Sequence, residues 1–158
     1  MRAVALDVDG VLGDTRPLWH AWLEDAARRF RPIAPLDLAV VPADRAEAAV
    51  LLDRWAANGV GDWQAALERF AEDHAPVYLR PDAGVGAALR RLHRAGVQLG
   101  AFTDAPEPLA RVALAQLGVS RRLDVLTTGG DALERLRERL GPETLVVRSR
   151  AELERAAT

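Results

Sequence analysis

The sequence predicts an α/β protein with a parallel sheet and an all-helical segment inserted after the first strand. From about residue 79 onward, short apolar runs alternate with amphipathic helical stretches, which is typical of parallel strands joined by right-handed crossovers. Between the first apolar run and residue 79, the periodicity is helical throughout. The chain has 158 residues, 49 % of them hydrophobic and 28 % charged, so it can bury a normal core.

The first strand is expected at Val4–Leu6, a short apolar run followed at once by Asp7, Asp9 and Gly10. Alternate side chains of a strand share a face, so both acids are expected to leave its end on the same side. Two adjacent carboxylates repel each other and are costly to keep ionised unless a cation or proton lies between them. Gly10 lets the backbone turn sharply and leaves room for a ligand.

An Asp-Gly pair after a strand has a second interpretation, because such pairs also form turns and calcium loops. Gly13 and Thr15 do not supply the alternating oxygen ligands that a helix–loop–helix calcium site needs. Open α/β sheets place their ligands at the carboxyl ends of the strands. The position of the acid pair therefore favours a functional site.

The inserted segment is predicted to contain three helices. They are expected from Pro17 to Phe30, from near Pro42 to Asn58, and from the N-cap Asp62 onward. All four tryptophans of the chain lie between residues 19 and 63. They suit either an aromatic binding surface or the core of a small helical unit, and their helical spacing favours the core.

After residue 79 the expected elements alternate. Helices are predicted at residues 83–95, 106–117, 132–140 and 151–156, and strands at 97–102, 123–127 and 144–147. Gly96 and Gly118 are expected to end the first two of these helices. No internal repeat or low-complexity tract interrupts the series.

The second predicted strand ends in Thr103 and Asp104, just before a helix whose first turn holds Pro106. A hydroxyl at a strand end, followed by a helix N-terminus, suits a phosphate group. The alternative is that Thr103 or Asp104 only caps that helix. The location one α/β unit after the acid pair favours contact with phosphate.

The run Asp7–Leu12 (DVDGVL) resembles the first signature of the haloacid dehalogenase-like (HAD) hydrolase superfamily, and Thr103 matches the second. The resemblance implies a HAD-like Rossmannoid core of residues 1–14 and 79–158, with a C1-type helical cap at 15–78. Family members that dehalogenate generally lack the second acid. The resemblance therefore implies a phosphoric monoester hydrolase that acts on a small phosphorylated metabolite.

In this family the first acid is the nucleophile and the second is the general acid/base, which implies these roles for Asp7 and Asp9. Thr103 is implied as the hydroxyl that bonds the transferring phosphoryl group. Mg²⁺ is expected on Asp7 and the backbone carbonyl of Asp9. Further phosphate contacts are expected from Val8, Gly10, Asp104 and Arg135.

Two family elements depart from the pattern. The third signature is a Lys or Arg, and this chain has no Lys, so Arg supplies all 21 basic residues. Arg135, Arg137 and Arg139 lie on one predicted helix, where at most one or two can turn inward. The alternative is that they belong to a solvated face with its neighbouring glutamates.

The fourth signature is acidic and follows the last core strand, where Arg148 and Ser149 stand here. Placing it instead at Gly130-Asp131 would leave the following helix and strand without a role. Without that acid, Mg²⁺ binding is expected to be weak. The Arg148 guanidinium could itself neutralise the acid pair or bind a phosphate, which would suit a catalytically impaired binding module, or it could simply extend outward.

Composition narrows the class of partner. A net charge of −2 and a pI of about 5.9 give no electrostatic reason to expect nucleic acid or an acidic membrane. The absence of cysteine excludes disulfides and thiolate chemistry. No signal peptide and no apolar run of membrane-spanning length is recognisable, so a cytoplasmic protein is expected.

Overall fold

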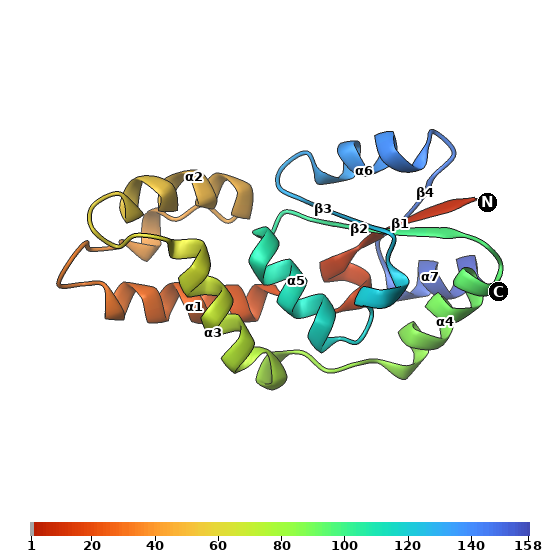
Figure 1. The fold of residues 1–158 in the computed structure, drawn as a ribbon, viewed down its shortest axis with the longest axis horizontal. Helices are drawn as coiled ribbons and strands as arrows, with labels where there is room; N and C mark the ends of the chain where they lie inside the picture. Colours follow the sequence, from red (N-terminus) through yellow and green to blue (C-terminus); the bar gives the residue numbers. More distant parts are fainter. Residues whose placement is uncertain (1) are drawn as a thin grey trace.

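The computed structural model describes residues 2–158 and contains a four-stranded parallel sheet in the order β3-β2-β1-β4 (Figure 1). The strands are β1 (Ala3–Asp7), β2 (Gln98–Thr103), β3 (Val125–Thr128) and β4 (Leu145–Val147). The helices are α1 (Arg16–Arg29), α2 (Arg45–Ala56), α3 (Trp63–Tyr78), α4 (Ala83–Arg94), α5 (Glu107–Gln116), α6 (Ala132–Leu140) and α7 (Arg150–Ala157). The predicted α/β class with a parallel sheet is confirmed.

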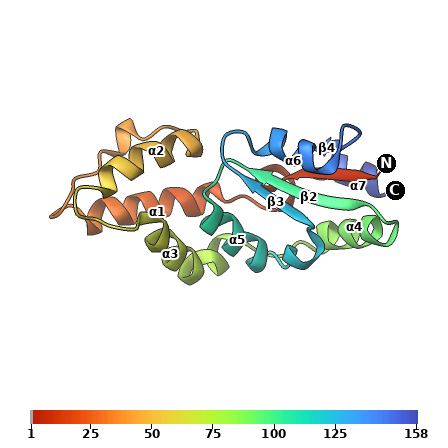
Figure 2. The ribbon, with the colours of Figure 1, turned by 45° about the horizontal axis from the view of Figure 1, so that its top comes forward.

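Helices cover both faces of the sheet, which is why β1 is buried continuously from Ala3 to Leu6. Val4 and Leu6 pack in the main core, which also contains side chains of α4, α5 and α7. Ala5 and Phe102 face the other way and pack against Leu136 of α6. Figure 2 shows α6 on one side of the sheet, with α4 and α5 on the other. Within residues 2–158, no helix is both long and apolar enough to cross a bilayer.

Helices α1, α2 and α3 extend away from the sheet and form the left half of the molecule in Figure 1. All four tryptophans are buried, and the rings of Trp19 and Trp22 pack at a tilt, with 5.5 Å between their centroids. The indole N–H of Trp55 donates to the Ala34 carbonyl at 2.8 Å. The tryptophans therefore form the core of the helical segment. The alternative interpretation, that they form an aromatic binding surface, is wrong.

Helix α2 begins at Arg45 rather than near Pro42. The Asp44 carboxylate accepts a hydrogen bond from the Glu47 N–H at 2.9 Å, so it is the N-cap that fixes this start. The residues before it include a short 3₁₀ turn, Leu38–Val40. The sequence contained this cap, but Pro42 at the head of the stretch was an equally acceptable first-turn residue.

The chain after β1 also differs from the expectation. Strand β1 ends at Asp7, and Val8–Leu12 form a single π-helical turn closed by a hydrogen bond from the Gly13 N–H to the Val8 carbonyl, 3.0 Å. Asp9 therefore does not continue the strand alternation. It belongs to the turn, from which its carboxylate still reaches the Thr103 hydroxyl at the end of β2, 3.2 Å away.

Candidate active site

The carboxyl ends of β1 and β2 open into a cavity of about 510 Å³ lined by Asp7, Asp9, Thr103 and Asp104. These two strands pair in parallel, with Asp7 opposite Phe102. Because parallel strands end at the same edge, side chains that follow separate strands meet there. The structure thus brings together the four side chains that the sequence singled out at the two strand ends.

Asp7 is half-buried at the end of β1. Burial raises the pKa of its carboxyl above the usual value, and the neighbouring Asp9 raises it further, whereas the Arg148 guanidinium lowers it. The Asp7 carboxylate lies 3.6 Å from the Arg148 guanidinium. A carboxylate with a raised pKa is a better base and nucleophile once it is ionised.

Asp9 is held by two threonines. One carboxylate oxygen accepts from the backbone N–H of Thr15 at 2.8 Å and from its hydroxyl at 2.6 Å. The other accepts from the Thr103 hydroxyl at 3.2 Å. Thr15 lies just before α1, so the contacts of Asp9 tie the start of the inserted segment to the end of β2.

Thr103 is buried, and its hydroxyl oxygen accepts from the Ala105 N–H at 3.1 Å while the hydroxyl donates to Asp9. Helix α5 has Pro106 at its N-cap, with no side chain bonded to its first turn. Thr103 and Asp104 are therefore not the caps of α5. The hydroxyl belongs to the loop that forms the floor of the cavity, which supports the phosphate-site alternative.

Arg45 is a site residue that the sequence reasoning missed. Its side chain is only 3 % exposed, and its guanidinium bonds to Asp9, Asp104 and the Thr15 hydroxyl. The backbone N–H of Arg45, at the first position of α2, also donates to Asp104 at 3.0 Å. Helix α2 thus docks its N-terminus on a carboxylate of the core, as the helix dipole favours.

A signal for Arg45 was present in the sequence. A cation in the first turn of a helix opposes the helix dipole, so it needs an acidic partner from elsewhere in the fold. That partner is Asp104, 59 positions away, which no local pattern identifies.

The remaining predicted phosphate contacts lie less centrally. Arg135 does not line the cavity. Its guanidinium pairs with Asp131 at 2.8 Å and donates to the Thr128 carbonyl. Arg137 lines the cavity instead. The side chain of Val8 is fully buried, so only its backbone is able to serve a ligand.

Gly10 is required for a different reason from the one expected. A Cβ atom on Gly10 would overlap the backbone carbonyl oxygen of Arg148, which follows β4. The space beside Gly10 is therefore occupied by the backbone of Arg148, and not by a ligand. The residue allows the turn after β1 and the end of β4 to pack against each other.

The residues at the end of β4 do not fit a magnesium site. Mg²⁺ prefers carboxylate and other oxygen ligands in octahedral geometry. The Ser149 hydroxyl oxygen accepts from the Glu152 N–H, and the Glu152 carboxylate accepts from the Arg148 N–H at 3.0 Å, so both are engaged in the N-terminal turn of α7. Among residues 2–158, no three acidic or histidine side chains are arranged to hold a metal ion.

The other placement considered for the acidic signature, Gly130-Asp131, follows β3. Strand β3 is separated from β1 by β2, whereas β4 pairs directly with β1, with Val147 opposite Leu6. The segment next to Asp7 is thus the one that begins with Arg148. This geometry agrees with the preferred placement after Val147.

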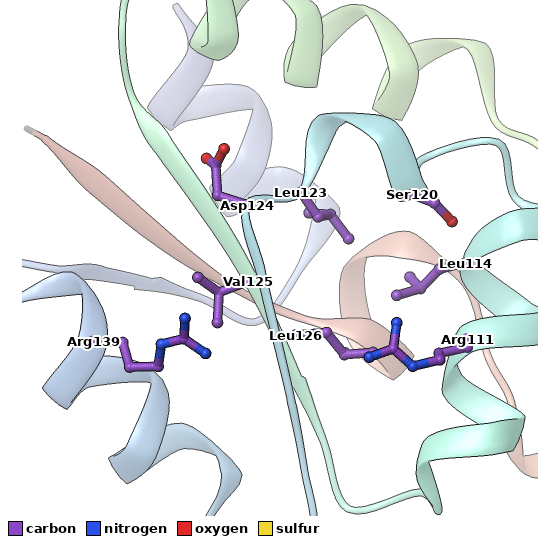
Figure 3. A pocket seen from close by; sticks show the side chains of 8 residues that line it. All are labelled: Arg111, Leu114, Ser120, Leu123, Asp124, Val125, Leu126 and Arg139. Atoms are coloured by element: carbon purple, nitrogen blue, oxygen red, sulfur yellow. The ribbon is translucent and has the colours of Figure 1, made fainter.

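A separate cavity of about 370 Å³ lies along β3 (Figure 3). Leu114, Val125 and Leu126 form much of its wall, with Arg111 and Arg139 on two sides of the strand. Arg111 already pairs with Glu107 at 2.7 Å. None of the predicted site residues lines this cavity, so we place the candidate active site at the carboxyl edge of β1 and β2.

The chain is similar to known hydrolases. A model of haloacid dehalogenase-like hydrolases matches residues 1–147, and the chain belongs to this family of hydrolases. A phosphoglycolate phosphatase of Xanthomonas campestris pv. campestris is 34 % identical over 140 residues. The match covers 84 % of this chain and 61 % of that protein, so the chain spans about three-fifths of the length of this relative.

Solved structures show the same fold. CbbY from Rhodobacter sphaeroides, determined in complex with phosphate, has a TM-score of 0.65 and 19 % identity, covering 92 % of this chain and 76 % of that chain. A HAD phosphatase from Thermococcus onnurineus has a TM-score of 0.54 and 19 % identity, covering 99 % of this chain and 97 % of that one. These likenesses support the HAD-like fold.

Proposed function

We propose that this protein is a phosphatase of a small phosphorylated metabolite and that it works through an aspartyl-phosphate. The observation that carries the proposal is the meeting of Asp7, Asp9 and Thr103 at one sheet edge, with the Thr103 hydroxyl 3.2 Å from the Asp9 carboxylate. The 34 % identity to a phosphoglycolate phosphatase supports it. A 2-carbon phosphorylated acid is therefore the first substrate to test.

The proposed chemistry has two steps. A carboxylate oxygen of Asp7 attacks phosphorus, the bond to the leaving oxygen breaks, and Asp9 gives that oxygen its proton. Water then attacks the phosphorus of the aspartyl-phosphate while Asp9 takes a proton from it, which releases phosphate and restores the Asp7 carboxylate. The Thr103 hydroxyl and the amides of the turn after β1 hold the phosphoryl oxygens.

We further infer that residues 15–78 act as a cap over a core of residues 1–14 and 79–158. The contacts of Arg45 with Asp9 and Asp104 support this division, because they join the helical segment to the cavity. Such a cap excludes water and selects the substrate by shape. A cytoplasmic location and the absence of nucleic-acid partners stay predictions. So does the weak Mg²⁺ binding through Asp7 and the Asp9 carbonyl that the family resemblance implies, although the donors at the end of β4 argue against it.

The test is hydrolysis of a panel of small phosphate esters by the wild type and by Asp7→Asn. Loss of a covalent nucleophile is expected to lower kcat by about a thousandfold or more. Asp73→Asn, the same chemical change on the exposed face of α3, is the matched control and is expected to keep full activity. Circular dichroism checks that each variant is folded. Activity that survives in Asp7→Asn would exclude aspartyl-phosphate chemistry.

A second candidate function is ligand binding without turnover. The specific observation in its favour is Arg148, a cation where the family signature carries an acid. This candidate predicts that the wild type binds inorganic phosphate but hydrolyses none of the esters. Hydrolysis abolished by Asp7→Asn would rule it out.

A further inference from the structure

Arg148 lies next to Asp7 because of the register of the sheet. Strand β4 pairs with β1 up to Leu6 and Val147, so the residues that follow on the two strands, Asp7 and Arg148, are adjacent. On the other side of β1, Asp7 is opposite Phe102. Phe102, Asp7 and Arg148 therefore form a row across three neighbouring chain segments at the mouth of the cavity.

The Arg148 side chain extends along this row. Its guanidinium carbon lies 5.4 Å from the centroid of the Phe102 ring, and its nitrogen lies 3.6 Å from the Asp7 carboxylate. A guanidinium over an aromatic face is attracted to the ring and is held in a defined plane. The alternative that Arg148 extends outward is thus not the arrangement seen.

The backbone of Arg148 is fixed as well. Its carbonyl oxygen packs against Gly10, and its N–H donates to Glu152 at 3.0 Å. The Arg148 side chain is still 57 % exposed, and Arg148 lines the cavity. A planar guanidinium donates two parallel N–H groups to phosphate oxygens, an arrangement that a single ammonium lacks.

The other cations near the cavity have different positions. The Arg45 guanidinium is buried on Asp9 and Asp104, and Arg135 is paired with Asp131. Arg137 lines the cavity from α6, the helix that packs on Ala5 and Phe102 of the sheet. Within the described chain, Arg148 is the arginine whose guanidinium contacts the predicted nucleophile.

We propose that the Arg148 guanidinium takes the place of the divalent cation, so that this site binds phosphate oxygens beside Asp7 without a metal ion. This inference rests on the phosphate site of the proposed function. It follows from a donor set that does not fit magnesium and from a fixed cation beside Asp7. It assigns Arg148 as a ligand-binding residue.

The test measures the binding of inorganic phosphate by calorimetry, once in EDTA and once in Mg²⁺. The wild type is expected to bind with the same Kd in both. Arg148→Ala is expected to weaken binding about ten- to a hundredfold, the effect of losing one charge-assisted pair. Arg94→Ala, an exposed arginine at the end of α4, is the matched control and should bind as the wild type does.

Arg148→Asp sharpens the test because it adds a carboxylate beside Asp7. This variant is expected to lose phosphate binding in EDTA and to recover it in Mg²⁺, and titration with Mg²⁺ alone should give a binding isotherm. Phosphate binding by the wild type that needs Mg²⁺ would overturn the inference. So would Arg148→Ala or Arg148→Asp binding phosphate in EDTA as tightly as the wild type.

Failure of this inference and failure of the proposed function are distinguishable. Ester hydrolysis that requires Mg²⁺ would leave the phosphatase proposal standing and remove the role of Arg148. Phosphate binding in EDTA without any hydrolysis would support the role of Arg148 and remove the phosphatase proposal. Hydrolysis that proceeds in EDTA and is lost in Arg148→Ala would support both.

Discussion

At the scale of the residue, the two acids of the first signature are in different environments. Asp9 is bonded to two threonines and to Arg45, whereas Asp7 is desolvated and lies beside another carboxylate. Burial and then Asp9 raise the pKa of Asp7, with Arg148 acting in the opposite direction. The proposed nucleophile is therefore a group that destabilises the fold when it is ionised.

This environment predicts a pH-dependent gain in stability for Asp7→Asn. An acid whose folded pKa is raised costs stability above that pKa, and the cost disappears as pH falls below its unfolded value. Asp7→Asn is expected to raise Tm at pH 7, with a difference that shrinks as the pH is lowered past the normal range for aspartate. Thermal melts of both proteins across this range, with Asp73→Asn beside them, measure the effect. A Tm that falls in Asp7→Asn at pH 7 would contradict it.

At the scale of the element, the site depends on how the turn after β1 packs against the end of β4. The turn is π-helical, and its Gly10 touches the backbone carbonyl of Arg148. Arg148 is also the residue whose guanidinium lies 3.6 Å from Asp7. The sequence suggested that Gly10 leaves room for a ligand. In the structure, Gly10 instead allows the end of β4 to pack against the turn after β1.

Gly10→Ala is expected to destabilise the protein by about 1–3 kcal/mol, the usual cost of overpacking against an atom that cannot rotate away. The clash is with backbone, so β4 or the turn must move. Urea unfolding measures the loss. Gly86→Ala, inside α4 with only the flexible Arg90 side chain nearby, is the control and is expected to be neutral or stabilising. Equal stability of Gly10→Ala and the wild type would refute the packing account.

At the scale of the whole molecule, one arginine connects the inserted helices to the sheet edge that carries the candidate active site. Arg45 is the first residue of α2, yet its partners Asp9 and Asp104 come from the loops after β1 and β2. The proposed cap is thereby linked to the proposed general acid/base. The same guanidinium that anchors the start of α2 also contacts the Asp9 carboxylate.

Arg45→Ala is expected to lower the free energy of unfolding by about 2 kcal/mol, because it leaves two partly buried carboxylates without their cation. It should also speed amide hydrogen exchange in α2, whose first N–H loses its organised partner. Arg54→Ala, exposed on the same helix, is the control. Unchanged exchange in α2 would show that other contacts hold the segment in place.

Much of this molecule was predictable from local patterns. The bounds of α6 were predicted to the residue, and Gly96 and Gly118 do end α4 and α5 with positive φ. The same logic identified Asp7, Asp9 and Thr103 at strand ends, which a parallel sheet brings to one edge. Periodicity and the alternation of strands with helices are properties of short stretches of sequence, so the sequence determined them by itself.

Only the tertiary structure decided which side chains pair across the cavity. Arg45 and Asp104 are 59 positions apart, and Arg148 reaches Asp7 because Val147 lies opposite Leu6 in the sheet. The choice between Arg135 and Arg137 also rested on the folded structure, since both are exposed on α6 but only Arg137 lines the cavity, while Arg135 pairs with Asp131. Pairings of this kind depend on the distance between elements after folding, which no spacing along the chain encodes.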